Sequence, residues 1–414
     1  MLQERLKKYA QLAVEVGIHV QKGQPVVLGY WHDPVLPEHV EFARLLVEAA
    51  YDAGASFVHV NWGDERWTRE TVRRGDLSFY EQLAADQAAY IEKLAQQGAA
   101  FLRIPASDPD LYNGLDAIRV GQADRMLTTA FNPFNFRRTN GEYSWSLVSA
   151  PTQVWADKVH SELPKDQRVD ALWEDILYCA RATGNDPVAD WKNHLLNLGK
   201  RRDWLNSLHI ASLHYEAPGT DLTITLPKEH FFAGAGDKTT SGATYVANIP
   251  TEEVFSVPTK TGVHGIVTST MPLNHNGALI DGFTLEFEHG RIVKYHAKTG
   301  QEALQNIIET DEGSHYLGEV ALVPVSSPIA TRGVLFYNTL FDENASCHLA
   351  IGKAYPLIKG GRQLNREEWE RHGLNDSLMH VDFMIGSKEL NITATTQNSE
   401  KVKILVQGEW AHEL

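Results

Sequence analysis

Three short apolar runs alternate with two helical patterns in the first 104 residues, and this alternation limits the possible folds more than any other feature of the chain. The runs cover residues 24–30, 57–62 and 99–104. The intervening segments, 37–54 and 76–97, place apolar side chains at helical spacing. Strand, helix and strand at this spacing predict right-handed βαβ units around a largely parallel sheet.

Strands predominate after a charged helical stretch that covers residues 173–206. Residues 221–226 and 283–287 alternate apolar and polar side chains, which is typical of half-buried strands. A capping box from Thr299 to Glu302 predicts the start of a helix. The second half therefore reads as a mixture of strands and helices with little βαβ alternation.

The length of the chain, 414 residues, exceeds what one hydrophobic core usually supports, so two domains are expected. The change of pattern places their boundary near residue 200. We predict an α/β N-terminal domain with a mostly parallel sheet over residues 1–200. An α+β catalytic, metal-binding domain is predicted to follow over residues 201–414.

The net charge of −15 argues against two classes of partner, nucleic acid and anionic membrane surfaces, which both need a basic face. No apolar run approaches 18 residues, so no membrane span is expected. The sequence holds two cysteines, too few for a disulfide framework, and its start lacks the apolar segment of a secretory signal. These observations favour a cytoplasmic protein.

Five potential metal ligands occur between residues 253 and 382: Glu253, Glu319, His348, His380 and Asp382. Two imidazoles and three carboxylates without a thiolate suit two divalent ions such as Zn²⁺, Co²⁺ or Mn²⁺, or Mg²⁺. Two such ions about 3.5–4 Å apart activate water against an amide or ester. Because the chain has 18 histidines and 53 acidic residues, spacing alone leaves a solvated Glu253 and a structural His348 open.

Four segments that contain these residues resemble motifs of the thermophilic aminopeptidases, a family of cytoplasmic dinuclear metallopeptidases. The segments are residues 248–255, 318–324, 340–355 and 375–386, in the family's order and separation. The resemblance extends over essentially the whole chain. It implies two metal ions on the five ligands, peptide substrates and a homodimer.

The resemblance also places Tyr355 at the reaction centre, where its hydroxyl would stabilise the oxyanion of a tetrahedral intermediate. The alternative is an aromatic side chain packed in the core. Glu252, next to Glu253, is a candidate general base, because aminopeptidases of other folds pair a base with a ligand in this way. Adjacent side chains of an extended segment point in opposite directions, however, so Glu252 reaches the site only if the backbone turns.

The leading hypothesis is a metal-dependent aminopeptidase that hydrolyses the N-terminal residue from peptides through a two-metal-activated water. The first alternative is a dinuclear metal amidohydrolase or phosphoesterase acting on a small molecule. A phosphoesterase would need cationic groups for phosphate, and none is evident near the motifs. The second alternative is a non-catalytic binding protein with a structural metal, against which the combination of Tyr355 with five ligands argues. No organic cofactor is expected, since Gly234-Ala235-Gly236 lacks the rest of a dinucleotide fingerprint.

Overall fold

The computed structural model describes residues 2–30, 33–105, 108, 110–275 and 277–413, and the chain forms two compact units. Unit 1 comprises the chain up to Asn193 together with Gly236–Pro250. Unit 2 comprises His194–Ala235 and the chain from Thr251 onward. The segment Gly236–Pro250 thus returns to unit 1 although it lies in the second half of the sequence.

Unit 1 contains a four-stranded sheet in the order β2-β1-β3-β4, and every pair of neighbours is parallel. Its strands are β1 (Pro25–Leu28), β2 (Phe57–Val60), β3 (Ala100–Arg103) and β4 (Trp145–Leu147). The apolar residues of β1 and β3 are buried, as their uninterrupted hydrophobic sequence predicts. The predicted α/β domain with a parallel sheet is therefore confirmed.

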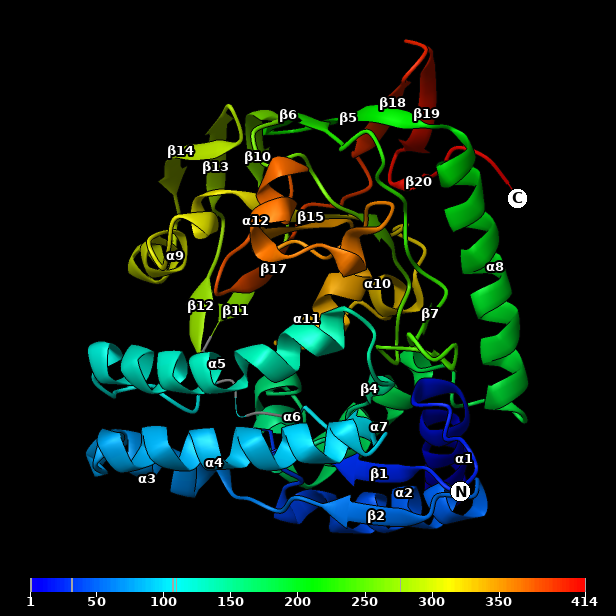
Figure 1. The fold of residues 1–414 in the computed structure, drawn as a ribbon, viewed down its shortest axis with the longest axis vertical. Coiled ribbons are helices and arrows are strands. Elements are labelled where there is room, and N and C mark those ends of the chain that lie inside the picture. Colours follow the sequence, from blue (N-terminus) through cyan, green and yellow to red (C-terminus); the bar gives the residue numbers. More distant parts are fainter. Residues whose placement is uncertain (1, 31–32, 106–107, 109, 276, 414) are drawn as a thin grey trace. The chain divides into compact units, whose positions relative to one another are not determined.

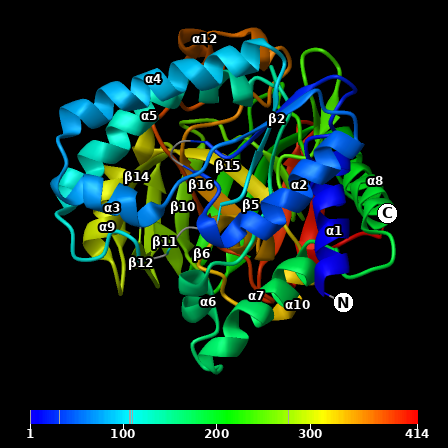
Figure 2. The ribbon, with the colours of Figure 1, turned by 90° about the horizontal axis from the view of Figure 1, so that it is seen from below.

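The helices of unit 1 precede, connect and follow these strands. They are α1 (Leu2–Leu12), η1 (Ala13–Gly17), η2 (Pro37–His39), α2 (Val40–Asp52), α3 (Glu65–Arg74), α4 (Leu77–Gln96), α5 (Ala117–Thr139), α6 (Gln153–Val159) and α7 (Lys165–Cys179). The side chain of Asp76 caps α4 by accepting a hydrogen bond from the N–H of Ser78. Helices α4 and α5 lie side by side (Figures 1 and 2). Strands β7 (Asp237–Lys238) and β8 (Thr244–Tyr245) form a small hairpin.

The predicted helical stretch 173–206 consists of two helices. Helix α7 ends at Cys179, and α8 (Pro187–Ser207) begins after a turn. Proline at the first position of α8 suits a helix start, because its missing N–H would have no partner there.

Unit 2 contains two antiparallel sheets. The larger has the order β14-β13-β10-β6-β5-β18-β19-β20, and the smaller has the order β17-β16-β15-β9. The larger sheet consists of β5 (Ile210–Ala217), β6 (Thr220–Thr225), β10 (Val263–Thr268), β13 (Thr284–Glu288), β14 (Arg291–His296), β18 (Asn391–Thr396), β19 (Lys401–Val406) and β20 (Glu409–Trp410). The smaller consists of β9 (Val254–Ser256), β15 (Leu317–Leu322), β16 (His348–Gly352) and β17 (His380–Met384).

Shorter elements complete unit 2, and together with the sheets they confirm the predicted mixture of helices and strands. They are the hairpin β11 (Leu273–His275) and β12 (Ala278–Ile280), with α9 (Gln301–Ile308), η3 (Gly313–His315), α10 (Pro328–Arg332), α11 (Thr339–Asp342), η4 (Glu343–Ala345), η5 (Gly361–Gln363) and α12 (Arg366–Arg371). Helix α9 starts where predicted, but the predicted capping box is wrong. Its N-cap is Gly300 in a left-handed conformation, without a side-chain cap.

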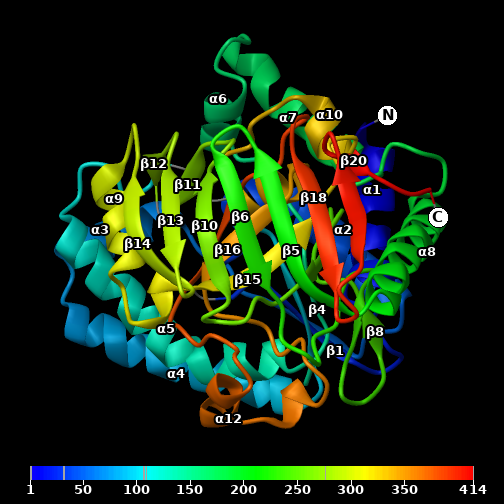
Figure 3. The same ribbon diagram turned by 90° about the horizontal axis from the view of Figure 1, so that it is seen from above.

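The hydrophobic core of unit 2 lies between the two sheets, which Figure 3 shows one behind the other. Leu213 and Leu285 of the large sheet share this core with Leu349 of the small one. The rings of Phe283 and Phe383 join the two layers, with centroids 5.4 Å apart. Burial of each such side chain contributes roughly 1.5–3 kcal/mol, so this face of the small sheet is fixed by packing.

Two findings bear on the expectations from composition. Cys179 and Cys347 are both buried free thiols. Among the described residues, no helix combines the length and the apolarity needed to cross a membrane. The free thiols agree with the expectation drawn from the cysteine count.

We predict that the buried His39 makes the protein less stable in mild acid. Its side chain is 1% exposed, and burial lowers its pKa to about 4, below the value of about 6.5 in an unfolded chain. The unfolded state therefore takes up the proton first. His39 should cost about 2 kcal/mol of unfolding free energy between pH 7 and pH 5.

Denaturant titrations of wild type and His39→Leu at both pH values measure this effect. The variant should lose correspondingly less stability on acidification. The same replacement at the exposed His264 should leave the pH dependence as in wild type. Equal acid sensitivity of His39→Leu and wild type would refute the prediction.

Candidate metal centre

The small antiparallel sheet of unit 2 brings the predicted ligands together on one face. Residues directly opposite each other in an antiparallel pair share a face, and every second residue along a strand does so too. Ala350 of β16 is opposite both Glu319 of β15 and Asp382 of β17. His348 and Gly352 flank Ala350 at that spacing, and Gly352 is opposite His380.

Glu253 joins the same face from the adjacent strand. Phe255 of β9 is opposite Ala321, which in turn is opposite His348, and Glu253 precedes Phe255 by two residues. Small side chains at Ala321, Ala350 and Gly352 leave room between the larger polar ones. The opposite face holds Val254, Val320, Leu322, Leu349, Ile351, Val381 and Phe383, all in the hydrophobic core.

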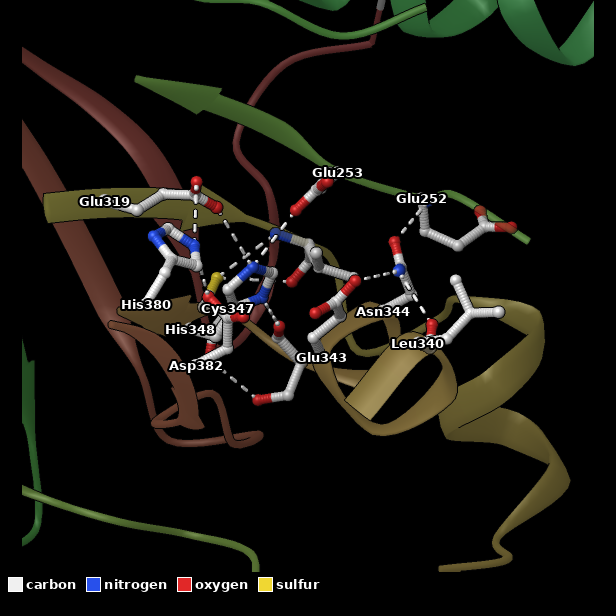
Figure 4. A network of polar contacts seen from close by, with 12 residues as sticks. Glu252, Glu253, Glu319, Leu340, Glu343, Asn344, Cys347, His348, His380 and Asp382 are labelled. Atoms are coloured by element: carbon white, nitrogen blue, oxygen red, sulfur yellow. Dashed lines mark hydrogen bonds and ion pairs between the residues drawn. The ribbon is translucent and has the colours of Figure 1, made fainter. Parts of the chain in front are cut away.

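The polar atoms of the five residues converge (Figure 4). His348 Nε2 lies 3.0 Å from Glu253 Oε2 and 3.5 Å from Glu319 Oε1. His380 Nε2 lies 3.7 Å from Glu319 Oε2 and 3.3 Å from Asp382 Oδ1. Glu319 thus faces one histidine with each of its oxygens.

Backbone hydrogen bonds orient both imidazoles. His348 Nδ1 donates to the carbonyl of Ser346 at 3.1 Å, and His380 Nδ1 donates to that of Lys353 at 2.6 Å. Each ring therefore presents Nε2 to the carboxylates. Metal-binding histidines commonly use the second nitrogen in this way.

The donor set fits divalent metal ions. Two groups of three residues, Glu253-Glu319-His348 and Glu319-His380-Asp382, each place ligand atoms within 4.8 Å of one another, and Glu319 belongs to both. Glu253 Oε2 and Asp382 Oδ1 are buried, and each lies beside an imidazole nitrogen, at 3.0 Å and 3.3 Å, without a hydrogen bond of good geometry. A cation would satisfy both oxygens.

The charges of the buried carboxylates also favour a bound cation. Burial and the nearby carboxylates raise the pKa of Glu319 to about 7, against the effect of the two histidines. Burial opposes protonation of His380, but Asp382 and Glu319 raise its pKa to about 9. Glu253 and Glu319 likewise raise the pKa of His348 well above its usual value, although burial acts against this. The buried carboxylates therefore favour positive charge at the position of the two imidazoles.

The two predicted catalytic residues lie in different surroundings. The Tyr355 ring is 5.5 Å from that of His380, edge to face, so Tyr355 borders the ligand cluster. Glu252 points away from Glu253 (Figure 4). Its Oε1 lies 3.8 Å from Nε2 of His194, a residue of α8. The opposite directions of Glu252 and Glu253 agree with an extended backbone.

Three residues of the site have no recognisable signal in the sequence: Glu343, Asn344 and His194. Buried Glu343 hydrogen-bonds to Asp382, and burial together with the charges of Asp382 and Glu253 raises its pKa well above the usual value. Its helical turn precedes His348 in the chain but has no ligand spacing of its own. Glu343 is a further carboxylate that could contact a metal.

Asn344 and His194 fix the backbone that carries Glu253. Asn344 Oδ1 accepts a hydrogen bond from the N–H of Glu252 at 2.8 Å. Its amide nitrogen donates to the carbonyl of Leu340 at 3.0 Å, which sets the orientation of the amide. His194 Nε2 donates to the carbonyl of Thr251 at 2.8 Å. The residues before Glu253 are therefore held from two elements.

A buried cluster of carboxylates and imidazoles on one face of a sheet is typical of the metal site of a hydrolase, and comparisons with known proteins show the class. The profile of the thermophilic metalloproteases (M29) matches residues 2–410. Aminopeptidase AmpS of Bacillus subtilis is 46% identical over 99% of this chain and 98% of its own. Aminopeptidase 2 of Geobacillus stearothermophilus is 42% identical over 100% and 99%.

A solved structure shows the same relationship. Wild-type AmpT from Thermus thermophilus superposes with a TM-score of 0.90 at 35% sequence identity, over 100% of both chains. The chain belongs to the thermophilic metalloprotease (M29) family. The resemblance drawn from the motifs is confirmed, and so is the expected class of enzyme, a metallo-aminopeptidase.

We predict that metal binding to the metal-free protein releases at least two protons per chain at pH 7, two from the imidazoles and a further fraction from Glu319, whose pKa is about 7. The pKa of His348 is raised well above its usual value and that of His380 to about 9, so both rings are protonated at pH 7. A metal ion binds only the neutral ring. The number of protons released on metal binding should therefore decrease as the pH rises through 9.

Calorimetric titration with Zn²⁺ in buffers of different ionisation enthalpy counts the protons. His380→Gln should release about one proton fewer. His214→Asn, on the solvent-facing side of the large sheet, should match wild type. A proton count that stays constant from pH 6 to pH 10 would contradict the prediction.

Proposed function

We propose that the protein removes the N-terminal residue from peptides through a water activated by two divalent metal ions. The observation that carries this proposal is the shared position of Glu319 in two donor groups. One carboxylate that faces two histidines with different oxygens suits a bridge between two ions. Glu253 and His348 would hold one ion, and His380 and Asp382 the other.

The ions, when bound, supply Lewis acidity toward the scissile carbonyl and lower the pKa of the attacking water. The residues of the chain fix the geometry. Carbonyls of Ser346 and Lys353 orient the imidazoles. Buried strands β15 and β17 hold Glu319 and Asp382 on either side of β16. The positively charged α-amino group of a peptide, which an exopeptidase must recognise, would meet a carboxylate of this cluster.

We propose Tyr355 as the donor to the developing oxyanion, supported by its position beside His380. For Glu252, expected as a general base, its contact with His194 supports a different role. We propose that Glu252 helps to hold the Thr251–Glu253 segment rather than to transfer protons. Glu343, which contacts Asp382, is better placed for proton transfer at the site.

The remaining features of the proposal rest on the resemblance to the family. They are a cytoplasmic location, a homodimer, and Zn²⁺, Co²⁺, Mn²⁺ or Mg²⁺ as the ions. The alternative of an amidohydrolase or phosphoesterase acting on a small molecule is not favoured, because the relatives that match over the whole chain are named aminopeptidases.

Hydrolysis of leucyl p-nitroanilide with and without a chelator tests the proposed function. We expect chelation to abolish the activity and about two ions per chain to restore it, because the two donor groups exceed what one tetrahedral catalytic ion needs. Elemental analysis alongside activity measures this. Full activity with one ion per chain would exclude the two-metal mechanism. A second test is the variant His348→Ala, which lacks one proposed ligand. It should remain inactive at saturating Co²⁺ while its circular dichroism stays native.

The replacement Tyr355→Phe tests the proposed oxyanion donor. Loss of one such donor typically lowers kcat by roughly 10²–10³, about 2.7–4 kcal/mol, and KM should change far less. The Phe ring keeps the packing against His380, so the hydroxyl alone is tested. A structural hydroxyl would instead lower the unfolding free energy by about 1 kcal/mol and leave kcat almost unchanged. Steady-state kinetics beside a melting curve separates the two outcomes.

A further inference from the structure

Phe255 presents an aromatic ring on the face of the small sheet that carries the metal ligands. Its neighbours in the strand, Val254 and Ser256, are buried, whereas Phe255 is partly exposed. The pairing of Phe255 with Ala321, which is itself opposite His348, places the ring two positions from Glu253 on the same face. An apolar side chain thus borders a cluster made of charged groups.

The backbone of Phe255 is held from both sides. Strand β15 pairs with it on one side. On the other, its N–H donates to the carbonyl of Ala233 at 3.1 Å and its carbonyl accepts from the N–H of Ala233 at 2.8 Å. Gly234 makes this approach possible, because a side chain there would lie 2.9 Å from the carbonyl oxygen of Glu253. The direction of the ring is therefore fixed by the sheet.

Phe255 and Tyr355 together form an aromatic wall beside the ligands. Their ring centroids are 6.0 Å apart in an edge-on arrangement, and Tyr355 is 5.5 Å from His380. The wall therefore runs from the strand of Glu253 to the ring of His380. Its exposed apolar surface contrasts with the buried carboxylates next to it.

We propose that Phe255 determines the preference for the N-terminal residue of the substrate and selects large apolar side chains. This inference rests on the proposed aminopeptidase function. The carboxylates and the ions take the amine and the scissile carbonyl, so the side chain of the first residue must lie within a few ångströms of the ligand face. Phe255 offers an apolar ring on the ligand face itself, next to Tyr355 and on a strand paired on both sides.

The test compares kcat/KM for leucyl and alanyl p-nitroanilide in wild type, Phe255→Ala and Phe255→Leu, each loaded with Co²⁺. A few methylene groups in an apolar subsite typically change kcat/KM by about 10-fold or more. We expect wild type to favour the leucyl substrate and Phe255→Ala to lose about 10-fold of this ratio. Phe255→Leu, which keeps an apolar side chain, should recover most of it.

Val254→Ala is the matched control, because the adjacent side chain points into the core. It should lower the melting temperature and leave the leucyl-to-alanyl ratio unchanged. A uniform fall for both substrates in Phe255→Ala would overturn the inference and assign Phe255 to the support of Tyr355. An unchanged ratio in an active Phe255→Ala would overturn it as well. An inactive metal-loaded wild type would instead refute the proposed function on which the inference rests.

Discussion

The burial of several carboxylates beside one another is the constraint on which the site depends. Glu253, Glu319, Glu343 and Asp382 lie among His348 and His380 with little access to water. Buried like charges repel each other strongly unless cations compensate them. The carboxylates accordingly raise the pKa of His380 to about 9 and that of His348 well above its usual value, although burial opposes both shifts. Divalent ions would supply the positive charge that these buried carboxylates require.

The surrounding structure provides what such a site requires. Packing of one face of the small sheet against the large one fixes β15 and β16, which are buried along their whole length. Hydrogen bonds from His194 and to Asn344 fix the irregular segment before β9. The ligands are thus placed by elements whose positions are determined by hydrophobic burial and backbone pairing. Little of the free energy of metal binding is then needed to order them.

Strands and helices with a clear hydrophobic pattern could be predicted from the sequence, and so could the site residues that lie within recognisable motifs. Apolar runs identified β1 and β3 because uninterrupted hydrophobic strands are typical of buried parallel sheets. The run at β2 also marked a strand, although its residues are only partly buried or exposed. The return of Gly236–Pro250 to unit 1 has no periodic signal. Nor does the contact of His194 with Glu252, since 58 positions of chain separate the two residues and only tertiary structure joins them. The capping box at Thr299 failed because Gly300, left-handed and free of strain, starts the helix instead.

Side chains of β15 alternate between the two faces of the sheet, so the length of this strand determines which of them reach the metal site. Glu319 and Ala321 face the ligands, while Val320 and Leu322 face the core. Deletion of one residue before Glu319 would exchange these faces, and so would an insertion there. Glu319 would then enter the hydrophobic core, and Val320 would take the position of the shared carboxylate. Such a strand tolerates some substitutions, but a change in its length would disrupt the hydrophobic core and the metal site at the same time.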